Sequence, residues 1–140
     1  MLRGPSCLRA AAAAVVTISA CGRNPFTPTV ADMAGTYSAT TFTSTNGATT
    51  TDHLAVGGSL TLTLGPDGTT TGRLFVPAGA EGGGDLDADM AGTWTLTGST
   101  VDFAQAADTF VRDMTFTAEP NRLRGSATFS GTTIRVVLER

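Results

Sequence analysis

The chain has 140 residues, with 9 basic against 12 acidic side chains and a formal net charge of -3. This length excludes a multidomain enzyme, and the acidic balance argues against a nucleic-acid-binding protein, which would carry clustered basic residues. With 41% hydrophobic and only 15% charged residues, the chain can form an apolar core and is not expected to be disordered.

Residues 1–20 have the composition of an export signal. The charges in this stretch are two arginines, an apolar run extends from Ala10 to Ile18, and two small residues follow it. These are the charged, apolar and small-residue regions of a signal peptide. The apolar run is too short to cross a bilayer, and Pro25 soon interrupts any continuing helix. We therefore expect residues 1–20 to direct export and to be removed.

The end of this signal carries a specific motif, because Ile18-Ser19-Ala20-Cys21 resembles the lipobox of bacterial lipoprotein precursors. In that family the precursor is cleaved just before the cysteine, whose thiol carries a diacylglycerol and whose new amino group is usually acylated. The resemblance implies that Cys21 is a lipidated N-terminus, held stably in a membrane by two or three acyl chains. It also implies, from Gly22 in place of Asp, sorting to an outer membrane with the domain facing the periplasm.

Cleavage would change the composition of the mature chain. The removed segment contains two of the arginines, so 7 arginines face 12 acids and the formal charge becomes -5. Cys7 leaves with the signal and Cys21 is acylated, so no thiol remains for a disulfide, a metal site or nucleophilic catalysis. A hydrophobic core must then supply the stability of the domain.

Residues 21–31 hold two prolines and no hydrophobic period, which predicts a flexible tether between the lipid and a single domain over residues 32–140. That domain is predicted to be almost entirely β. Leu60, Leu62 and Leu64 alternate with threonines, the period-two pattern of a strand with one wet face. The Gly-Pro-Asp-Gly sequence at 65–68 then predicts a turn.

The second half has the same pattern of short apolar-alternating stretches and turn residues. Phe110, Met114 and Phe116 are predicted to share one face of a longer strand. Turns are predicted at 119–122 and 130–131, and an additional hairpin at Asn46-Gly47. Together these patterns predict about eight strands.

An internal repeat supports a division into two β halves. The heptapeptide Ala31–Tyr37 is matched by Ala88–Trp94, and the two copies differ only in the final aromatic residue. Two similar halves are typical of duplication. Chance similarity in a chain rich in Thr, Gly and Ala is the alternative.

Many short strands without a long helix predict a single antiparallel up-and-down β-barrel, with a β-sandwich as the alternative. Gly35-Thr36-Tyr37 and Gly92-Thr93-Trp94 resemble the Gly-x-Trp opening of lipocalin-like barrels. In that family the aromatic side chain plugs the closed end of the barrel, and an arginine from the last strand packs on it. The resemblance implies these roles for Tyr37 and for Arg135 or Arg140.

The sequence offers few groups for catalysis. His53 is the single histidine, lies in a polar stretch, and is expected to be a solvated loop residue rather than a general base. The sequence lacks a Gly-x-Ser-x-Gly elbow, a phosphate-binding loop and a dinucleotide fingerprint. We therefore expect a protein that is not an enzyme and that uses no cofactor.

One acidic cluster stands out in a glycine-rich stretch: Glu81, Asp85, Asp87 and Asp89. Carboxylates at alternate positions of a flexible loop could surround a hard cation such as Ca²⁺. The spacing nevertheless departs from an EF-hand, which needs Gly where Met90 stands. A solvated loop joining the two halves is favoured, with Asp89 capping a local turn, and a metal site at Asp85, Asp87 and Asp89 is the less favoured alternative.

The inward-facing positions of the predicted barrel are apolar. A barrel of about eight strands is just wide enough either to be filled by side chains or to hold one small ligand. Gly125 and Ala127 lie on an inward stripe and would leave room. The inward set is Leu60, Leu62, Leu64, Leu74, Val76, Trp94, Leu96, Phe103, Phe110, Met114, Phe116, Phe129, Ile134, Val136 and Leu138.

The resulting hypothesis is a non-catalytic, membrane-anchored envelope lipoprotein that binds a small apolar ligand and no nucleic acid. The predicted walls of its ligand site are Trp94, Phe103, Met114, Phe116 and Phe129. The alternative is a structural or protein-interaction lipoprotein of the envelope, with a filled core and a partner at its Thr-rich outer face or acidic loop.

Overall fold

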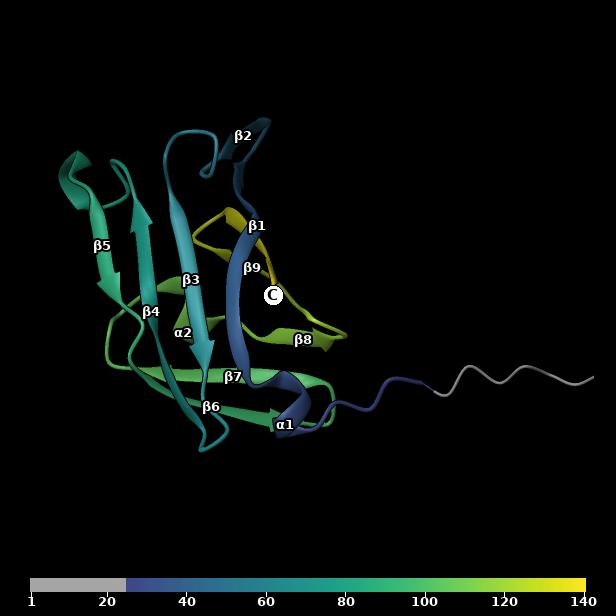
Figure 1. Cartoon of the computed structure of the whole chain (residues 1–140). Coiled ribbons are helices and arrows are strands. Elements are labelled where there is room, and N and C mark those ends of the chain that lie inside the picture. The colour runs from purple at the N-terminus through teal and green to yellow at the C-terminus, as the bar shows by residue number, and fades with distance from the viewer. Residues whose placement is uncertain (1–24) are drawn as a thin grey trace, which may run out of the picture.

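The computed structural model describes residues 25–140 (Figure 1). The predicted signal peptide, Cys21 and the first part of the tether lie outside the described residues. No helix within residues 25–140 is long and apolar enough to cross a membrane. The elements are α1 (Val30–Met33), β1 (Gly35–Asn46), β2 (Thr49–Asp52), β3 (Ser59–Leu64), β4 (Thr69–Val76), the 3₁₀ turn η1 (Glu81–Gly83), β5 (Leu86–Asp89), β6 (Gly92–Thr97), β7 (Thr100–Gln105), α2 (Phe110–Asp113), β8 (Phe116–Glu119), β9 (Arg122–Phe129) and β10 (Thr132–Glu139).

Eight antiparallel strands close into a barrel, in the order β1-β3-β4-β6-β7-β8-β9-β10. Closure comes from the pairing of β10 with β1, which runs from Ser38 opposite Glu139 to Asn46 opposite Thr132. The two additional strands, β2 and β5, pair with the C-terminal parts of β1 and β4. The predicted barrel is therefore confirmed, and closure removes the exposed strand edges that a sandwich would leave.

Local turn chemistry accounts for the hairpins that the sequence predicts. At the tip of the β3–β4 hairpin, Asp67 Oδ1 accepts hydrogen bonds from the backbone and hydroxyl groups of Thr69. Between β9 and β10, Ser130 and Gly131 have φ values of 47° and 82°. Positive φ at both central residues is what a two-residue type I′ hairpin requires.

The longer strand predicted through Phe110, Met114 and Phe116 is wrong. Phe110–Asp113 forms the short helix α2, and β8 begins at Phe116. Phe110 and Met114 are four residues apart, and this spacing fits both one helical turn and an alternating strand. The charges favour the helical turn, because Arg112 pairs with Asp108 one turn earlier and also with Asp113.

The two copies of the internal repeat agree from their glycine onward. Gly35 and Gly92 each open a strand, and the aromatic residues Tyr37 and Trp94 are both buried. The residues just before the glycine differ in structure, because the first copy forms α1 and the second forms part of β5. The repeat therefore marks equivalent strand starts in the two halves and does not extend to equivalent elements before them.

One hydrophobic cluster fills the barrel, and every residue of the predicted inward set lies in it or packs against it. The largest fully buried side chains include Tyr37, Phe42 and Phe116. Alternation along the strands thus identifies the core correctly, because successive side chains of a strand point to opposite faces.

Helix α1 covers one end of the barrel, and the tether leads into it there (Figure 1). The buried Tyr37 hydroxyl donates a 2.9 Å hydrogen bond to the Met33 carbonyl. The Arg140 guanidinium lies 5.7 Å from the Tyr37 ring centroid and donates to the Ala34 carbonyl at 2.6 Å. This is the closed-end arrangement that the lipocalin resemblance implied, and of the two candidate arginines it is Arg140 that packs on Tyr37.

Candidate functional site

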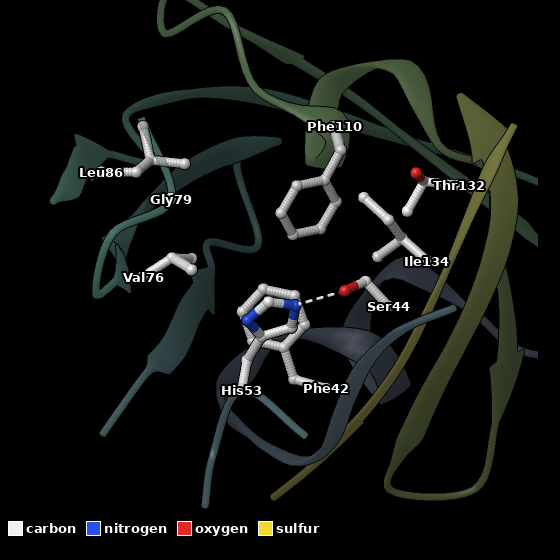
Figure 2. A pocket seen from close by; sticks show the side chains of 9 residues that line it. All are labelled: Phe42, Ser44, His53, Val76, Gly79, Leu86, Phe110, Thr132 and Ile134. Atoms are coloured by element: carbon white, nitrogen blue, oxygen red, sulfur yellow. Dashed lines mark hydrogen bonds between the residues drawn. The ribbon is translucent and has the colours of Figure 1, made fainter. Parts of the chain in front are cut away.

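A pocket of about 210 Å³ lies at the end of the barrel opposite α1 (Figure 2). Its walls come from the last residues of β1 and β4 and the first residues of β10, all at the end away from α1. The segments after β2 and β4, strand β5 and helix α2 complete it. The lining residues are Phe42, Ser44, His53, Val76, Gly79, Leu86, Phe110, Thr132 and Ile134.

A β-bulge in β1 delivers two of these side chains. Ala39 pairs with Leu138 and Thr41 with Val137, so one extra residue, Thr40, is inserted between them. An inserted residue moves all later side chains of a strand to the opposite face. Tyr37 therefore faces inward before the bulge, and Phe42 and Ser44 face the pocket after it.

The backbone of His53 is held from two sides. Its amide donates to the Phe42 carbonyl at 2.8 Å, and its carbonyl accepts from the Gly58 amide at 2.7 Å. Asp52 Oδ1 accepts from the amides of Leu54 and Ala55, which fixes the turn that follows. These bonds direct the imidazole back over the end of β1.

The His53 side chain makes two contacts there. Its ring lies 4.6 Å from the Phe42 ring, measured between centroids, and its Nε2 is 2.8 Å from the Ser44 hydroxyl oxygen (Figure 2). Burial lowers the pKa of His53, and the negative charge of Asp52 only partly opposes this effect. The imidazole is therefore held neutral at neutral pH. The expectation of a solvated loop histidine is wrong, since His53 is half-buried.

The remaining pocket walls are mostly apolar. Phe110 projects from α2 with its ring toward Phe42 and His53, and the two phenyl centroids are 5.4 Å apart (Figure 2). Leu86 and Val76 lie on one side of the cavity, and Ile134 lies on the other. The hydroxyl of Thr132 already accepts a hydrogen bond from the Asn46 amide at 3.0 Å. Apart from the already bonded Thr132 hydroxyl, the Ser44–His53 pair is thus the polar part of an otherwise apolar cavity.

This arrangement suits hydrogen bonding to a ligand better than nucleophilic attack. A serine nucleophile needs a base that a third group orients. Among the described residues, the His53 ring makes one hydrogen bond, to Ser44. The adjacent Asp52 carboxylate accepts hydrogen bonds from backbone amides instead. No charged side chain lines the pocket, so it presents a neutral surface.

The five residues predicted as ligand walls lie elsewhere in the same core cluster. Trp94, Phe103, Met114 and Phe116 are buried, and Phe129 is half-buried. The structure brings Phe103 and Phe116 together edge to face, with centroids 5.3 Å apart. None of the five lines the pocket at the barrel end.

The space that Gly125 was expected to leave is occupied. A Cβ at this position would lie 2.5 Å from Met114 Sδ and 2.8 Å from a ring carbon of Phe116. Both side chains are fully buried. The glycine on this inward stripe therefore accommodates its own neighbours rather than a ligand.

The acidic residues turn toward separate partners. Asp85 accepts from the Ala78 amide, and Asp87 forms an ion pair with Arg73. Asp89 accepts from the Ala91 amide at 2.8 Å and so caps a local turn. Within residues 25–140, no group of three or more His, Cys, Asp or Glu side chains is placed to hold a metal ion.

A second, polar groove of about 450 Å³ lies on the outer wall, over β8, β9 and β10. Its lining includes Arg124, Ser126 and Arg135. Arg124 also approaches Glu119 at 3.4 Å. This groove is separate from the apolar pocket in both location and chemistry.

Neither a protein-family model, nor a curated protein, nor a solved structure matches this chain. The geometry of the barrel and its pocket therefore carries the functional argument.

The residues missed by sequence reasoning are those that the bulge and the loops bring to the barrel end, chiefly Phe42, Ser44 and His53. Phe110 and Ile134 were recognised as inward-facing, but nothing in the sequence assigned them to a pocket. The sequence contains one usable signal, the apolar spacing along β1. Inward side chains of a regular strand are an even number of residues apart, but Tyr37 and Phe42 are five residues apart.

Proposed function

We propose that this chain is a membrane-anchored lipoprotein of the bacterial envelope that binds a small apolar molecule at the end of its barrel, without catalysis. The observation that carries the proposal is the pocket beside Phe42 and Phe110, which combines apolar walls with a single polar pair. Concave, mostly apolar cavities with a few converging polar groups are the usual form of small-molecule sites.

The size of the pocket limits its ligand. The pocket volume of about 210 Å³ exceeds the roughly 150 Å³ of an apolar cavity that holds benzene. It falls below the range of about 300–1,000 Å³ typical for drug-sized ligands. A substituted single ring or a short hydrocarbon chain fits these limits, whereas a complete phospholipid does not.

The proposed anchor also sets the direction in which the pocket faces. Cys21 precedes Val30, the first residue of α1, by nine residues, which reach at most about 32 Å when fully extended. Helix α1 lies at the closed end of the barrel (Figure 1), and the pocket is at the other end. A lipid on Cys21 would therefore join the domain at its closed end, with the pocket at the end away from this attachment.

Native mass spectrometry tests the binding function directly. The purified chain is incubated with a total envelope extract, and a heat-unfolded sample serves as the control. A discrete added mass is expected on the folded protein only. Ser44→Phe should fill the pocket and remove this mass, whereas Ser38→Phe makes the same change on the exposed face of the same strand and should retain it.

A folded protein that carries no added mass, in either the wild-type or the Ser38→Phe form, would contradict ligand binding. That result would favour the alternative of a structural or interaction lipoprotein with a filled core.

The anchor is tested separately by Cys21→Ser. Removing the thiol that would carry the diacylglycerol should move the protein from the membrane fraction to the soluble fraction. Ser38→Phe, which leaves the cysteine intact, should remain in the membrane fraction. Unchanged membrane retention of the Cys21→Ser protein would refute lipidation at this residue.

A further inference from the structure

The apolar cavity contains one polar pair, Ser44 and His53. Ser44 and His53 belong to different segments, their side chains meet at 2.8 Å, and the His53 ring also lies 4.6 Å from the Phe42 ring between centroids. A hydroxyl placed in apolar surroundings costs free energy unless it is hydrogen-bonded. One bond to His53 leaves the Ser44 oxygen with unused hydrogen-bonding capacity.

We infer that Ser44 and His53 form a single recognition site for an uncharged hydroxyl group, and that the preferred ligand is a small phenol or alcohol. This inference rests on the proposed binding function and specifies its ligand. The hydrocarbon body of the ligand lies among Phe42, Phe110 and Ile134, and its hydroxyl reaches the Ser44–His53 pair (Figure 2).

The chemistry of the pair favours a hydroxyl in particular. If the serine donates to the imidazole, its oxygen can accept from the ligand, and if the imidazole donates, the serine can donate to the ligand. A hydroxyl group can serve in either role, because it is both a donor and an acceptor.

Electrostatics disfavour a charged ligand head. No basic side chain lines the pocket to pair with a carboxylate. The nearest carboxylate in sequence, Asp52, is used by the Leu54 and Ala55 amides and adds negative charge next to His53. An unpaired ion in this cavity would therefore carry an uncompensated desolvation cost.

Isothermal titration calorimetry with ethylbenzene and 4-ethylphenol tests the inference, because these probes differ only by the hydroxyl. The full chain is used with Cys21→Ser in every form, so that no acyl chain is attached. The wild-type pocket is expected to bind both probes. In Ser44→Ala/His53→Phe, the affinity for 4-ethylphenol should fall about tenfold relative to that for ethylbenzene, the cost of an unpaired hydroxyl.

Two controls accompany the double variant. Retained ethylbenzene binding shows that the double variant still folds and that its pocket persists. Thr132→Val also removes one hydroxyl from the pocket wall, but one that already bonds to Asn46, and it should leave the ratio of the two affinities unchanged.

The outcomes separate the two levels of the proposal. If neither probe binds to the folded wild-type protein, the proposed binding function at this pocket is refuted. If both bind and the double variant leaves their ratio unchanged, ligand binding stands and hydroxyl recognition by Ser44 and His53 is refuted. A loss of discrimination in Thr132→Val would also refute it, because the recognising group would then be Thr132.

Discussion

Gly125→Ala tests whether the barrel interior at β9 is filled. The added Cβ would lie 2.5 Å from Met114 Sδ and 2.8 and 2.9 Å from two ring carbons of Phe116. Met114 is 1% and Phe116 0% exposed, so neither side chain can relieve the contact without shifting inside the core. Overpacking of this kind costs about 1–3 kcal/mol.

The change also acts on the unfolded chain. Replacing glycine by alanine restricts the unfolded backbone and contributes roughly 0.4–1 kcal/mol in the opposite direction. The two ranges combine to a net loss in the free energy of unfolding of about 0–2.6 kcal/mol, with about 1.3 kcal/mol expected from their midpoints. Urea unfolding followed by fluorescence is a suitable assay, because the chain has one tryptophan.

A matched control separates packing from backbone effects. At Gly84 an added Cβ would meet only Ala80 Cβ, at 4.0 Å, so Gly84→Ala should show the backbone effect alone and raise the free energy of unfolding by about 0.4–1 kcal/mol. In the Gly125→Ala background, Met114→Ala should cost less than it does alone, because it relieves one of the clashes. If Gly125→Ala is as stable as Gly84→Ala, the interior has spare room at β9 and the packing argument fails.

Two further predictions concern the core and the pocket. Trp94 is 4% exposed, and its indole N–H donates a hydrogen bond to the Gly65 carbonyl. Trp94→Ala should therefore lower the free energy of unfolding by about 3–5 kcal/mol, measured by urea unfolding followed by circular dichroism. A loss below about 1 kcal/mol would place this side chain outside the core. Burial lowers the pKa of His53, so the unfolded chain takes up the proton first as the pH falls, and the free energy of unfolding should decrease below about pH 6.5. His53→Gln should remove this part of the decrease between pH 7.5 and 5, and an unchanged pH profile in the variant would contradict the assignment.

Much of the barrel was predictable because its signals are local. Alternating leucines in β3 identify an inward face, and Ser130-Gly131 identifies a tight hairpin, without reference to any distant residue. The same period of two places every residue of the predicted inward set in the core cluster or against it. The lipocalin resemblance added one long-range expectation, the packing of Arg135 or Arg140 on Tyr37, and the structure shows that Arg140 takes this position.

The candidate site was not predictable in the same way. One inserted residue at Thr40 reverses the faces of β1, so that a strict alternation from Tyr37 would point Phe42 outward. His53 follows a polar stretch and owes its burial to a loop that folds back over Phe42. Its hydrogen bond to Ser44 depends on both effects together.

The sequence by itself thus determined most of the strands, their turns and much of the apolar interior, because period, propensity and turn chemistry act between near neighbours. Only the tertiary structure decided that β10 closes on β1, that Met114 and Phe116 occupy the space at Gly125, and that a pocket forms at the end opposite α1. Each of these depends on contacts between residues far apart in the chain, and their relative placement is set by the register of strand pairing and the closure of the barrel.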